Sequence, residues 1–425
     1  MNKDDFYCLV MFPYPSGDGL HVGHAYNYAV MDSYCRWMKY KGKNVFQPFG
    51  FDSFGLPAEN YAKKHGMDPR DVTYENIERF KGQMKHMDTD FEYRFNTSDE
   101  SYQKWTKWLF TELKKAGLAY KKMAPVNYCP GCETVLANEQ VKEDKCDRCK
   151  SEVEMKDLEQ WFFKITDYRE RLMNNLDWID YPESTKKQQR HWLEEGKFKD
   201  WCVSRQRKWG CPIPVEGEED TLDTFVDSSF YYLRYLTDSE GEFLPKEDYK
   251  QVDLCVGGNE HACMHLIYSR FINMFLYDQG YVTEEEPFKR VVHQGMITKS
   301  GTKMAKSTGN VVNPDDYDPD ELRMYLMFLG HYFDGGDWDD SKIKGIRRAL
   351  GKWGRWIKAA TEDGEEVDTE KLKEDIDGFV MSFKFNKVIS TMSEFYNKNK
   401  GKNINKETAK RFEQMIICFA PGFKK

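Results

Sequence analysis

An apolar run that ends in a proline- and glycine-rich turn constrains the fold of this chain more than any other feature. Residues 6–12 are continuously apolar, and residues 13–17 read Pro-Tyr-Pro-Ser-Gly. This pattern is typical of a buried parallel strand that leads into a turn. Apolar positions then recur at helical spacing over residues 24–40, and residues 44–49 predict the next strand. The order indicates a β–α–β unit.

The same pattern returns later in the chain. Residues 252–256 and 291–297 predict two further strands, followed by Gly257-Gly258 and by a loop over residues 298–307. We expect helix over residues 74–120 and a loop-rich segment over residues 125–155. From residue 319 onward the pattern is helical, with runs near 341–360, 370–399 and 405–419. Alternating strands and helices predict an open, doubly wound parallel α/β sheet that binds ligands at the carboxyl ends of its strands.

Size and charge exclude few functions. With 425 residues we expect several domains, and 40% hydrophobic residues suffice for several cores. The net charge of −8 shows no overall basic character. Two basic clusters, near residues 186–208 and 342–355, are equally consistent with nucleic-acid contact and with a solvated helix face. No apolar run approaches the ~20 residues that span a bilayer, and residues 1–5 show no signal-peptide pattern, so we expect a cytoplasmic protein without membrane contact.

Four of the eleven cysteines form a metal-site pattern. Cys129 and Cys132 form one C-x₂-C pair, and Cys146 and Cys149 form another 13 residues later. This spacing predicts a tetrahedral zinc site, and four thiolates leave no open position, so the zinc would be structural. Disulfides, which a reducing cytosol disfavours, and an iron–sulfur site are the alternatives.

Two segments carry groups suited to a triphosphate. His21 and His24 stand three residues apart where the first helix begins, so both rings can donate to phosphate oxygens at a helix N-terminus. Lys303 and Lys306 lie in a glycine-bearing loop and can neutralise a leaving pyrophosphate. Taken alone, surface histidines and surface lysines explain each segment as well.

Two further segments carry polar groups at strand ends. Asp52 lies among aromatic residues, where a carboxylate can bind an amine through a charge-assisted hydrogen bond. His261 and His265 are one helical turn apart after Gly257-Gly258, and they face one pocket or, with a third ligand that the sequence does not supply, bind a metal.

Together these segments resemble the leucyl-tRNA synthetase family of class I aminoacyl-tRNA synthetases. His21-Val22-Gly23-His24 looks like the first class I signature, and Lys303-Met304-Ala305-Lys306-Ser307 looks like the second, with alanine where the family usually has serine. Residues 11–17, 47–59 (with Phe51 where tryptophan is usual), 201–214, 227–232 and 257–265 resemble leucine-branch segments. The likeness covers roughly residues 6–340.

The resemblance implies a Rossmann-like catalytic domain, a small zinc-binding module and a C-terminal α-helical bundle. It implies ATP, Mg²⁺ and structural Zn²⁺ as cofactors, and leucine and the acceptor end of tRNA(Leu) as partners. The site residues that it implies are as follows: for catalysis, His21, His24, Lys303 and Lys306; for ATP, Gly23, Gly258, Glu260, His261, Met304 and Ser307; for leucine, Phe12, Tyr14, Asp52, Ser228, Tyr232 and His265.

Two departures from the family shape the expectation. Only residues 193–200 separate Trp192 from Trp201, where relatives insert an editing domain, so we expect leucine–tRNA ligation without post-transfer editing. The helical tail is short, which leaves room for a separate tRNA-binding subunit. A paralogue that loads leucine onto a non-tRNA acceptor and a non-catalytic RNA-binding relative are the alternatives.

These segments predict a division of the chain. We expect the catalytic domain in residues 1–122 and 216–300, interrupted by a zinc-binding module at 123–158 and by a connective remnant at 159–215. A lysine-loop and stem-contact region at 301–340 and a shortened anticodon-binding-like bundle at 341–425 follow.

Overall fold

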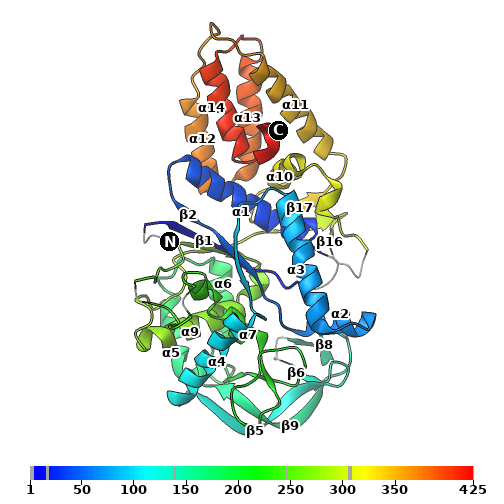
Figure 1. Cartoon of the computed structure of the whole chain (residues 1–425), viewed down its shortest axis with the longest axis vertical. Coiled ribbons are helices and arrows are strands. Elements are labelled where there is room, and N and C mark those ends of the chain that lie inside the picture. The colour runs from blue at the N-terminus through cyan, green and yellow to red at the C-terminus, as the bar shows by residue number, and fades with distance from the viewer. Residues whose placement is uncertain are drawn as a thin grey trace.

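The computed structural model describes residues 4–15, 19–136, 140–238, 240–245, 247–304 and 309–424. The molecule is elongated (Figure 1). A helical bundle forms one end, a parallel sheet with its helices forms the middle, and an antiparallel sheet forms the other end.

The central sheet contains four parallel strands in the order β14-β13-β1-β2. Its strands are β1 (Phe6–Val10), β2 (Val45–Phe46), β13 (Leu254–Gly257) and β14 (Val291–His293). The expected parallel α/β fold is therefore confirmed. Because all four strands run the same way, the turns that follow β1, β13 and β14 meet at one edge.

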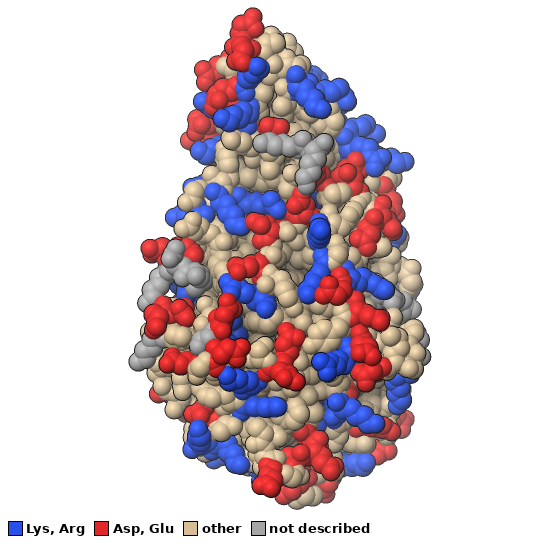
Figure 2. Space-filling view, viewed as in Figure 1, with Lys and Arg blue, Asp and Glu red and all other residues tan. Residues whose placement is uncertain are grey.

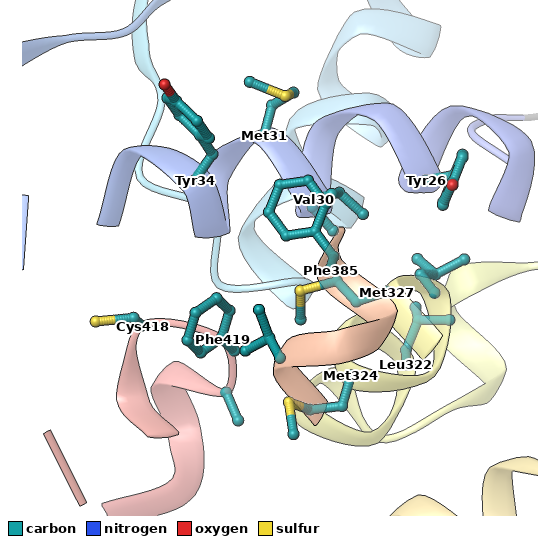
Figure 3. Packing of buried hydrophobic residues seen from close by; sticks show 14 of the residues in the cluster. Tyr26, Val30, Met31, Tyr34, Leu322, Met324, Met327, Phe385, Cys418 and Phe419 are labelled. Atoms are coloured by element: carbon teal, nitrogen blue, oxygen red, sulfur yellow. The ribbon is translucent and has the colours of Figure 1, made fainter. Parts of the chain in front are cut away.

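Helix α1 (Val22–Tyr40) is buried on most of its circumference because it lies between the sheet and the bundle (Figure 1). Figure 3 shows its apolar side chains packed against α10 (Pro319–Phe328) and the C-terminal helices. The Arg323 guanidinium, fully buried, donates to Asp32 at 2.7 Å and to Ser33 at 2.9 Å. Arg323 also donates to the carbonyl of Phe419, so this one side chain of α10 joins α1 to the end of the bundle.

The bundle consists of α11 (Ile343–Lys358), α12 (Glu370–Met381), α13 (Phe385–Asn399) and α14 (Lys406–Ile417), followed by the 3-10 turn η6 (Pro421–Lys424). The expected helix over residues 370–399 is interrupted at Phe383. This residue adopts a left-handed φ of 58°, and its buried ring stacks on Tyr34 at 5.5 Å.

The opposite end is an antiparallel sheet in the order β10-β9-β5-β6. It is built from β5 (Ala119–Cys129), β6 (Thr134–Leu136), β9 (Glu154–Phe163) and β10 (Trp201–Cys202). The expectation of a loop-rich segment over residues 125–155 is therefore wrong in part, since β5 and β9 pair along ten residues. Small strands β7 (Val141–Lys142) and β8 (Lys145–Cys146) lie between them in the chain.

Three other expected elements differ from the structure. The helix over residues 74–120 is replaced by α3 (Pro69–His86), β4 (Glu92–Asn96), α4 (Glu100–Lys115) and the start of β5. The strand over residues 44–49 divides into β2 and β3 (Pro48–Phe51), and β3 pairs with β4 outside the central sheet. The strand over residues 291–297 divides into β14 and β15 (Met296–Lys299), which pairs with β16 (Thr302–Lys303) and β17 (Gly335–Trp338). Each expected element differs from the observed one because strands from distant segments pair, and the periodicity of residues along the sequence does not reveal such pairing.

The remaining elements are short strands, 3-10 turns and helices, several of which are buried. They are α2 (Leu56–His65), η2 (Ile165–Tyr168), α5 (Arg169–Asn175), α6 (Glu183–Trp192), β11 (Ser204–Arg205), β12 (Thr221–Leu222), α7 (Thr224–Ser228), α8 (Tyr231–Arg234), η3 (Asn259–His261), α9 (His265–Asp278) and η5 (Pro314–Asp316). Within the described ranges, no helix combines the length and the apolar character needed to cross a bilayer.

Candidate active site

Segments from distant parts of the sequence meet at the carboxyl edge of the central sheet. Three backbone hydrogen bonds join them: Met11 N to Val256 O at 2.8 Å, Asp52 N to Pro13 O at 3.0 Å, and Val22 N to Val312 O at 3.0 Å. The histidine turn, the segment that carries Asp52, the turn after β13 and the chain that leaves the lysine loop are therefore neighbours.

The histidine pair caps the N-terminus of α1. Nδ1 of His21 accepts from the backbone N–H of Gly23 at 3.0 Å, and Nδ1 of His24 accepts from the backbone N–H of His21 at 3.3 Å. The ring centroids lie 4.0 Å apart. An acceptor at Nδ1 places the proton of the neutral ring on Nε2, so each ring offers an Nε2–H donor at a helix N-terminus. A Cβ at Gly23 would lie 2.7 Å from the His21 ring, so the glycine is needed for this cap as well as for any ligand.

One lysine of the loop is described and the other is not. Lys303 is exposed in β16, paired with Thr298 of β15, whereas Met304 is buried in the core that surrounds α1. The predicted roles of Lys306 and Ser307 fall outside the described residues. The structure thus places Lys303 at the start of a loop whose far end is joined to the histidine turn.

Gln83 of α3 makes that junction and was not among the predicted residues. Its Oε1 accepts from Leu20 N at 2.6 Å, and its Nε2 lies 3.1 Å from Asn313 Oδ1 and 3.3 Å from both Leu20 O and Asp315 Oδ2. The side chain is 3% exposed. Helical periodicity assigns such a residue only to a buried face, and no sequence pattern reports its partners.

Asp52 is a buried carboxyl with hydroxyl partners. It is 1% exposed, and its Oδ1 accepts from Thr224 at 2.8 Å and from Thr97 at 3.4 Å, while Tyr14 supplies a third hydroxyl. Burial raises the pKa of Asp52 to about 8; the three hydroxyls oppose the rise and nearby Asp223 adds to it. A carboxyl that is costly to ionise in isolation is suited to an incoming ammonium group.

Two other buried acids lie near Asp52. Asp223 is paired with Arg205 at 2.6 Å, both being almost fully buried. Burial, and then Asp52, raise the pKa of Asp227 well above its usual value, and Thr106 donates to its Oδ1 at 2.7 Å. Asp223 therefore already has its cation, whereas neither Asp52 nor Asp227 has an ion pair among the described residues.

A buried aromatic cluster lies between α8 and the end of β1. Phe12 stacks on Tyr231 at 4.1 Å, and Tyr231 lies 5.7 Å from the ring of His265. Nδ1 of His265 is 3.2 Å from Ser228 Oγ, whereas His265 Nε2 and the Tyr231 hydroxyl are buried with no hydrogen-bond partner among the described residues. Burial, aided by His261, lowers the pKa of His265 to about 3, so the ring is neutral.

Tyr232, which the resemblance assigned to the leucine site, is not part of this aromatic cluster. Its hydroxyl donates to Asn273 at 2.9 Å, and its ring packs against Phe288 at 5.2 Å. The neighbouring Tyr231 lies between Phe12 and His265 instead. The Tyr231-Tyr232 pair contains two identical side chains, so composition did not distinguish the one that packs between Phe12 and His265.

The turn after β13 brings Gly258, Glu260 and His261 to the same edge. A Cβ at Gly258 would lie 2.1 Å from a carboxylate oxygen of Glu260, so the Glu260 side chain folds over this glycine. Burial lowers the pKa of His261, with His293 adding to the effect and Glu260 opposing it.

His293 and Thr185 support this turn and were not predicted. His293 Nδ1 donates to Gly257 O at 2.9 Å, which leaves Nε2 to accept from Thr185 Oγ1 at 2.7 Å. These bonds fix the carbonyl of the residue before Gly258 from a neighbouring strand and from α6.

The four predicted metal ligands form one cluster. Cys129, Cys132, Cys146 and Cys149 place their sulfur atoms within 4.8 Å of one another, with Cys129 and Cys149 at 3.3 Å and Cys132 and Cys146 at 3.9 Å. Ligands at ~2.3 Å in a tetrahedron are separated by ~3.8 Å, so the set fits one zinc ion. The spacing in the sequence identified all four.

Comparisons with known proteins agree with this geometry. Residues 1–254 and 216–337 match the family described as tRNA synthetases class I (I, L, M and V). The leucine–tRNA ligase of Clostridium tetani is 31% identical, over 98% of this chain and 85% of the relative. The chain belongs to the leucyl-tRNA synthetase family. Its enzyme class, aminoacyl-tRNA ligase, follows from this membership.

Solved synthetases share the fold. The Agrobacterium radiobacter K84 agnB2 LeuRS, solved in a ternary complex with tRNA and LeuAMS, aligns with a TM-score of 0.90, 24% identity and coverage of 99% of this chain and 84% of that one. Methionyl-tRNA synthetase of Mycobacterium tuberculosis, bound by methionyl-adenylate, aligns with a TM-score of 0.77 at 19% identity, over 98% and 89% of the two chains.

This family member is shorter inside the aligned region. The alignment with the Clostridium tetani relative extends over 687 positions, more than the 425 residues of this synthetase. Relatives therefore carry segments that have no counterpart here. Between α6, which ends at Trp192, and β10, which begins at Trp201, only eight residues remain.

Proposed function

We propose that this chain is a leucine–tRNA ligase that activates leucine with ATP and transfers it to tRNA(Leu) without post-transfer editing. The observation that carries the proposal is the buried Asp52 carboxyl near a buried aromatic cluster, at the same sheet edge as the histidine turn and the lysine loop. The ligase names of the similar relatives support leucine and tRNA as substrates.

Each group has a role in this proposal. Asp52, with Tyr14, binds the ammonium of leucine, and Phe12, Tyr231, Ser228 and His265 enclose its aliphatic side chain. The leucine carboxylate attacks the α-phosphorus of ATP, the bond to the pyrophosphate breaks, and no protein nucleophile is needed. A hydroxyl of the terminal adenosine of tRNA then attacks the adenylate carbonyl, and AMP leaves.

Two groups of side chains are proposed to stabilise the negative charge of the phosphates. The Nε2–H groups of His21 and His24 donate to phosphate oxygens, and Lys303 and Lys306 balance the leaving pyrophosphate. Gly258, Glu260 and His261 are proposed to contact the nucleoside, with Gly23, Met304 and Ser307 completing the ATP site. Mg²⁺ neutralises triphosphate oxygens when it is bound, and it is usually held largely by those phosphates.

Zinc is proposed to hold the loop between β5 and β9. All four positions of a tetrahedral ion are filled by Cys129, Cys132, Cys146 and Cys149, so no position is open for catalysis. The ion would replace an apolar core, which in this part consists of few side chains.

The bundle offers a surface for tRNA. Lysine and arginine side chains follow one exposed face of α11 at helical spacing, and Figure 2 shows blue side chains gathered at this edge of the bundle. They are Lys344, Arg347, Arg348, Lys352, Arg355 and Lys358. Contacts of this kind depend steeply on salt, whereas a merely solvated face does not bind RNA.

Absence of editing is proposed from the short connection at residues 193–200. A pocket alone separates aliphatic amino acids that differ by one methylene by roughly 10–200-fold. We therefore expect detectable activation and charging of close analogues such as norvaline, isoleucine, valine or methionine. Rapid hydrolysis of preformed mischarged tRNA by this chain would refute this part.

Pyrophosphate exchange with each amino acid in turn tests the first step. We expect leucine to support exchange. His24→Ala should reduce the exchange rate at temperatures where the variant is fully folded, although loss of its hydrogen bond at the α1 cap costs ~1 kcal/mol of stability. Charging of purified leucine tRNA tests the second step. Exchange without charging would indicate a different acceptor, and absence of exchange would refute the proposal.

A further inference from the structure

Helix α6 carries two fully buried polar side chains on one of its faces. Thr185 and Gln189 are four residues apart, so they lie on the same side of the helix, and both have an exposed fraction of 0%. Polar groups that are buried in this way need hydrogen-bond partners, because an unpaired one destabilises the fold. Their partners therefore identify what this face of α6 holds in place.

Gln189 holds the end of the turn that follows β13. Its Nε2 donates to Ala262 O at 2.8 Å, and its Oε1 accepts from Arg270 Nη1, also at 2.8 Å. Arg270 belongs to α9, which lies beside α6 (Figure 1). Since a guanidinium group only donates, Arg270 determines which end of the amide faces Ala262. Arg270 is itself fixed by two hydrogen bonds of 2.8 Å to the buried carboxylate of Glu286.

Thr185 holds the start of the same turn through His293. The carbonyl of Gly257 can only accept, so Nδ1 of His293 carries a proton and donates to this carbonyl at 2.9 Å. Nε2 of the neutral ring then accepts from Thr185 Oγ1 at 2.7 Å. Burial lowers the pKa of His293, which favours this neutral form.

The two sets of hydrogen bonds hold opposite ends of one short segment. Gly257 and Ala262 flank the three residues that are proposed to contact the nucleoside, Gly258, Glu260 and His261. The segment between the two carbonyls contains a single 3-10 turn of three residues, an element with weak hydrogen-bond geometry of its own. Its position therefore depends on how its two ends are held.

We propose that this face of α6 positions the ATP site. Two hydrogen-bond relays, Thr185–His293 and Gln189–Arg270, hold the turn over residues 257–262 where it meets the nucleoside. The four side chains are positioning residues, because they act through the turn and need not touch the nucleotide. The inference rests on the proposed function, since it names what fixes one wall of that ATP site. The proposed ammonium site lies on other segments, so loss of a relay should weaken ATP binding much more than leucine binding.

Gln189→Met tests the first relay, because it removes the donor to Ala262 and the acceptor for Arg270 with little change in volume. The matched control is Asn399→Leu, at a bundle side chain that is 3% exposed and donates to Phe395 O at 2.9 Å. Pyrophosphate exchange is measured at a temperature where every variant is folded. Gln189→Met should raise the KM for ATP at least roughly five-fold, the equivalent of one net hydrogen bond, and leave the KM for leucine within about two-fold. An unchanged KM for ATP, or an equal rise in both KM values, would overturn the proposal.

Two substitutions of His293 test the second relay by rescue. The amide nitrogen of asparagine can take the position of Nδ1, so His293→Asn keeps a donor for Gly257 O. Glutamine places its amide near the position of Nε2, so His293→Gln loses that donor. The KM for ATP should therefore stay near the wild-type value in His293→Asn and rise in His293→Gln, and equal values in the two variants would contradict the relay.

The choice between ATP and 2′-deoxy-ATP gives a readout that a general loss of stability does not change. A carboxylate such as Glu260 accepts from a ribose hydroxyl, so the wild type should prefer ATP. This preference should shrink in Gln189→Met and His293→Gln and stay unchanged in Asn399→Leu. An undiminished preference in both relay variants would overturn the inference even if leucine activation is confirmed. Absence of exchange in the wild type would instead count against the proposed function.

Discussion

Leucine affinity should rise steeply with pH, because the ammonium of leucine needs an ionised Asp52. In the unliganded protein burial raises the pKa of Asp52 to about 8, so the carboxyl is mostly protonated at neutral pH. Free leucine keeps its ammonium over the range from pH 6 to 8. Binding therefore releases one proton from Asp52, and alkaline conditions favour the complex.

The magnitude follows from the ionised fraction. With a pKa of about 8, Asp52 is ionised in about 1% of molecules at pH 6 and in about half of them at pH 8. The apparent Kd scales inversely with the competent fraction, so it should fall about 50-fold over these two units, equivalent to about 2.3 kcal/mol. Above pH 8 the apparent Kd should approach a constant value, because Asp52 is then mostly ionised.

Isothermal titration of leucine at several pH values, in buffers of different ionisation enthalpy, measures both the affinity and the released proton. Asp52→Asn should bind leucine weakly and without this pH dependence. Asp227→Asn is the matched control, because it removes a neighbouring buried carboxyl whose pKa burial also raises, and it should retain the wild-type slope. A flat affinity profile in the wild type, or proton uptake on binding, would refute the reasoning.

The free energy of unfolding should depend on pH through the same Asp52 carboxyl, but in the opposite direction to leucine affinity. An acid whose pKa is raised on folding holds its proton more tightly in the folded chain, so stability falls as pH rises from its usual value near 4 to about 8. Relative to wild type, Asp52→Asn should therefore gain about 1.4 kcal/mol of unfolding free energy per pH unit in that window. Equal stability of the two proteins at every pH would show that the carboxyl is well solvated.

Three further outcomes are expected. Gln83→Met should lower the exchange rate at saturating ATP and leucine, because it removes the link between the histidine turn and the lysine loop. Gln47→Met should not, because this equally buried side-chain amide has no hydrogen-bond partner among the described residues. Equal exchange rates of the two variants contradict the link. Asp32→Asn should lower the free energy of unfolding, measured by denaturant titration, by about 3–5 kcal/mol, because it leaves Arg323 buried without a counter-ion. A decrease below ~1 kcal/mol would indicate that water reaches this ion pair. Cys146→Ser, or chelation, should release zinc measured by a chromogenic chelator and expose the loop between β5 and β9 to protease, and unchanged cleavage contradicts a structural ion.

The sequence predicted those features that depend on order along the chain. The run over residues 6–12 and the helix after it gave β1 and α1, and the parallel sheet followed from the alternation of strands and helices. The cysteine spacing placed four sulfur atoms in one cluster. In each case the pattern is a spacing of residue types along the sequence, which can be recognised without knowing which distant segments pair in the fold.

Pairing between distant segments was not predictable in this way. Strand β4 lies within the segment expected to be one helix, and it exists because β3 pairs with it. Residues 291–297 divide because β15 leaves the central sheet to pair with β17. Local propensity is overridden where a distant partner supplies the hydrogen bonds.

The same distinction applies inside the site. Asp52 was expected from its position at a strand end, but the feature that suits it to an amine is its burial among Thr97, Thr224 and Tyr14, which come from three other segments. Tyr231 and Tyr232 differ only in which neighbour they meet, Phe12 in one case and Phe288 in the other. The chemistry of such a residue is therefore set by its contacts in the fold, and the residue type at a motif position states only what that chemistry can be.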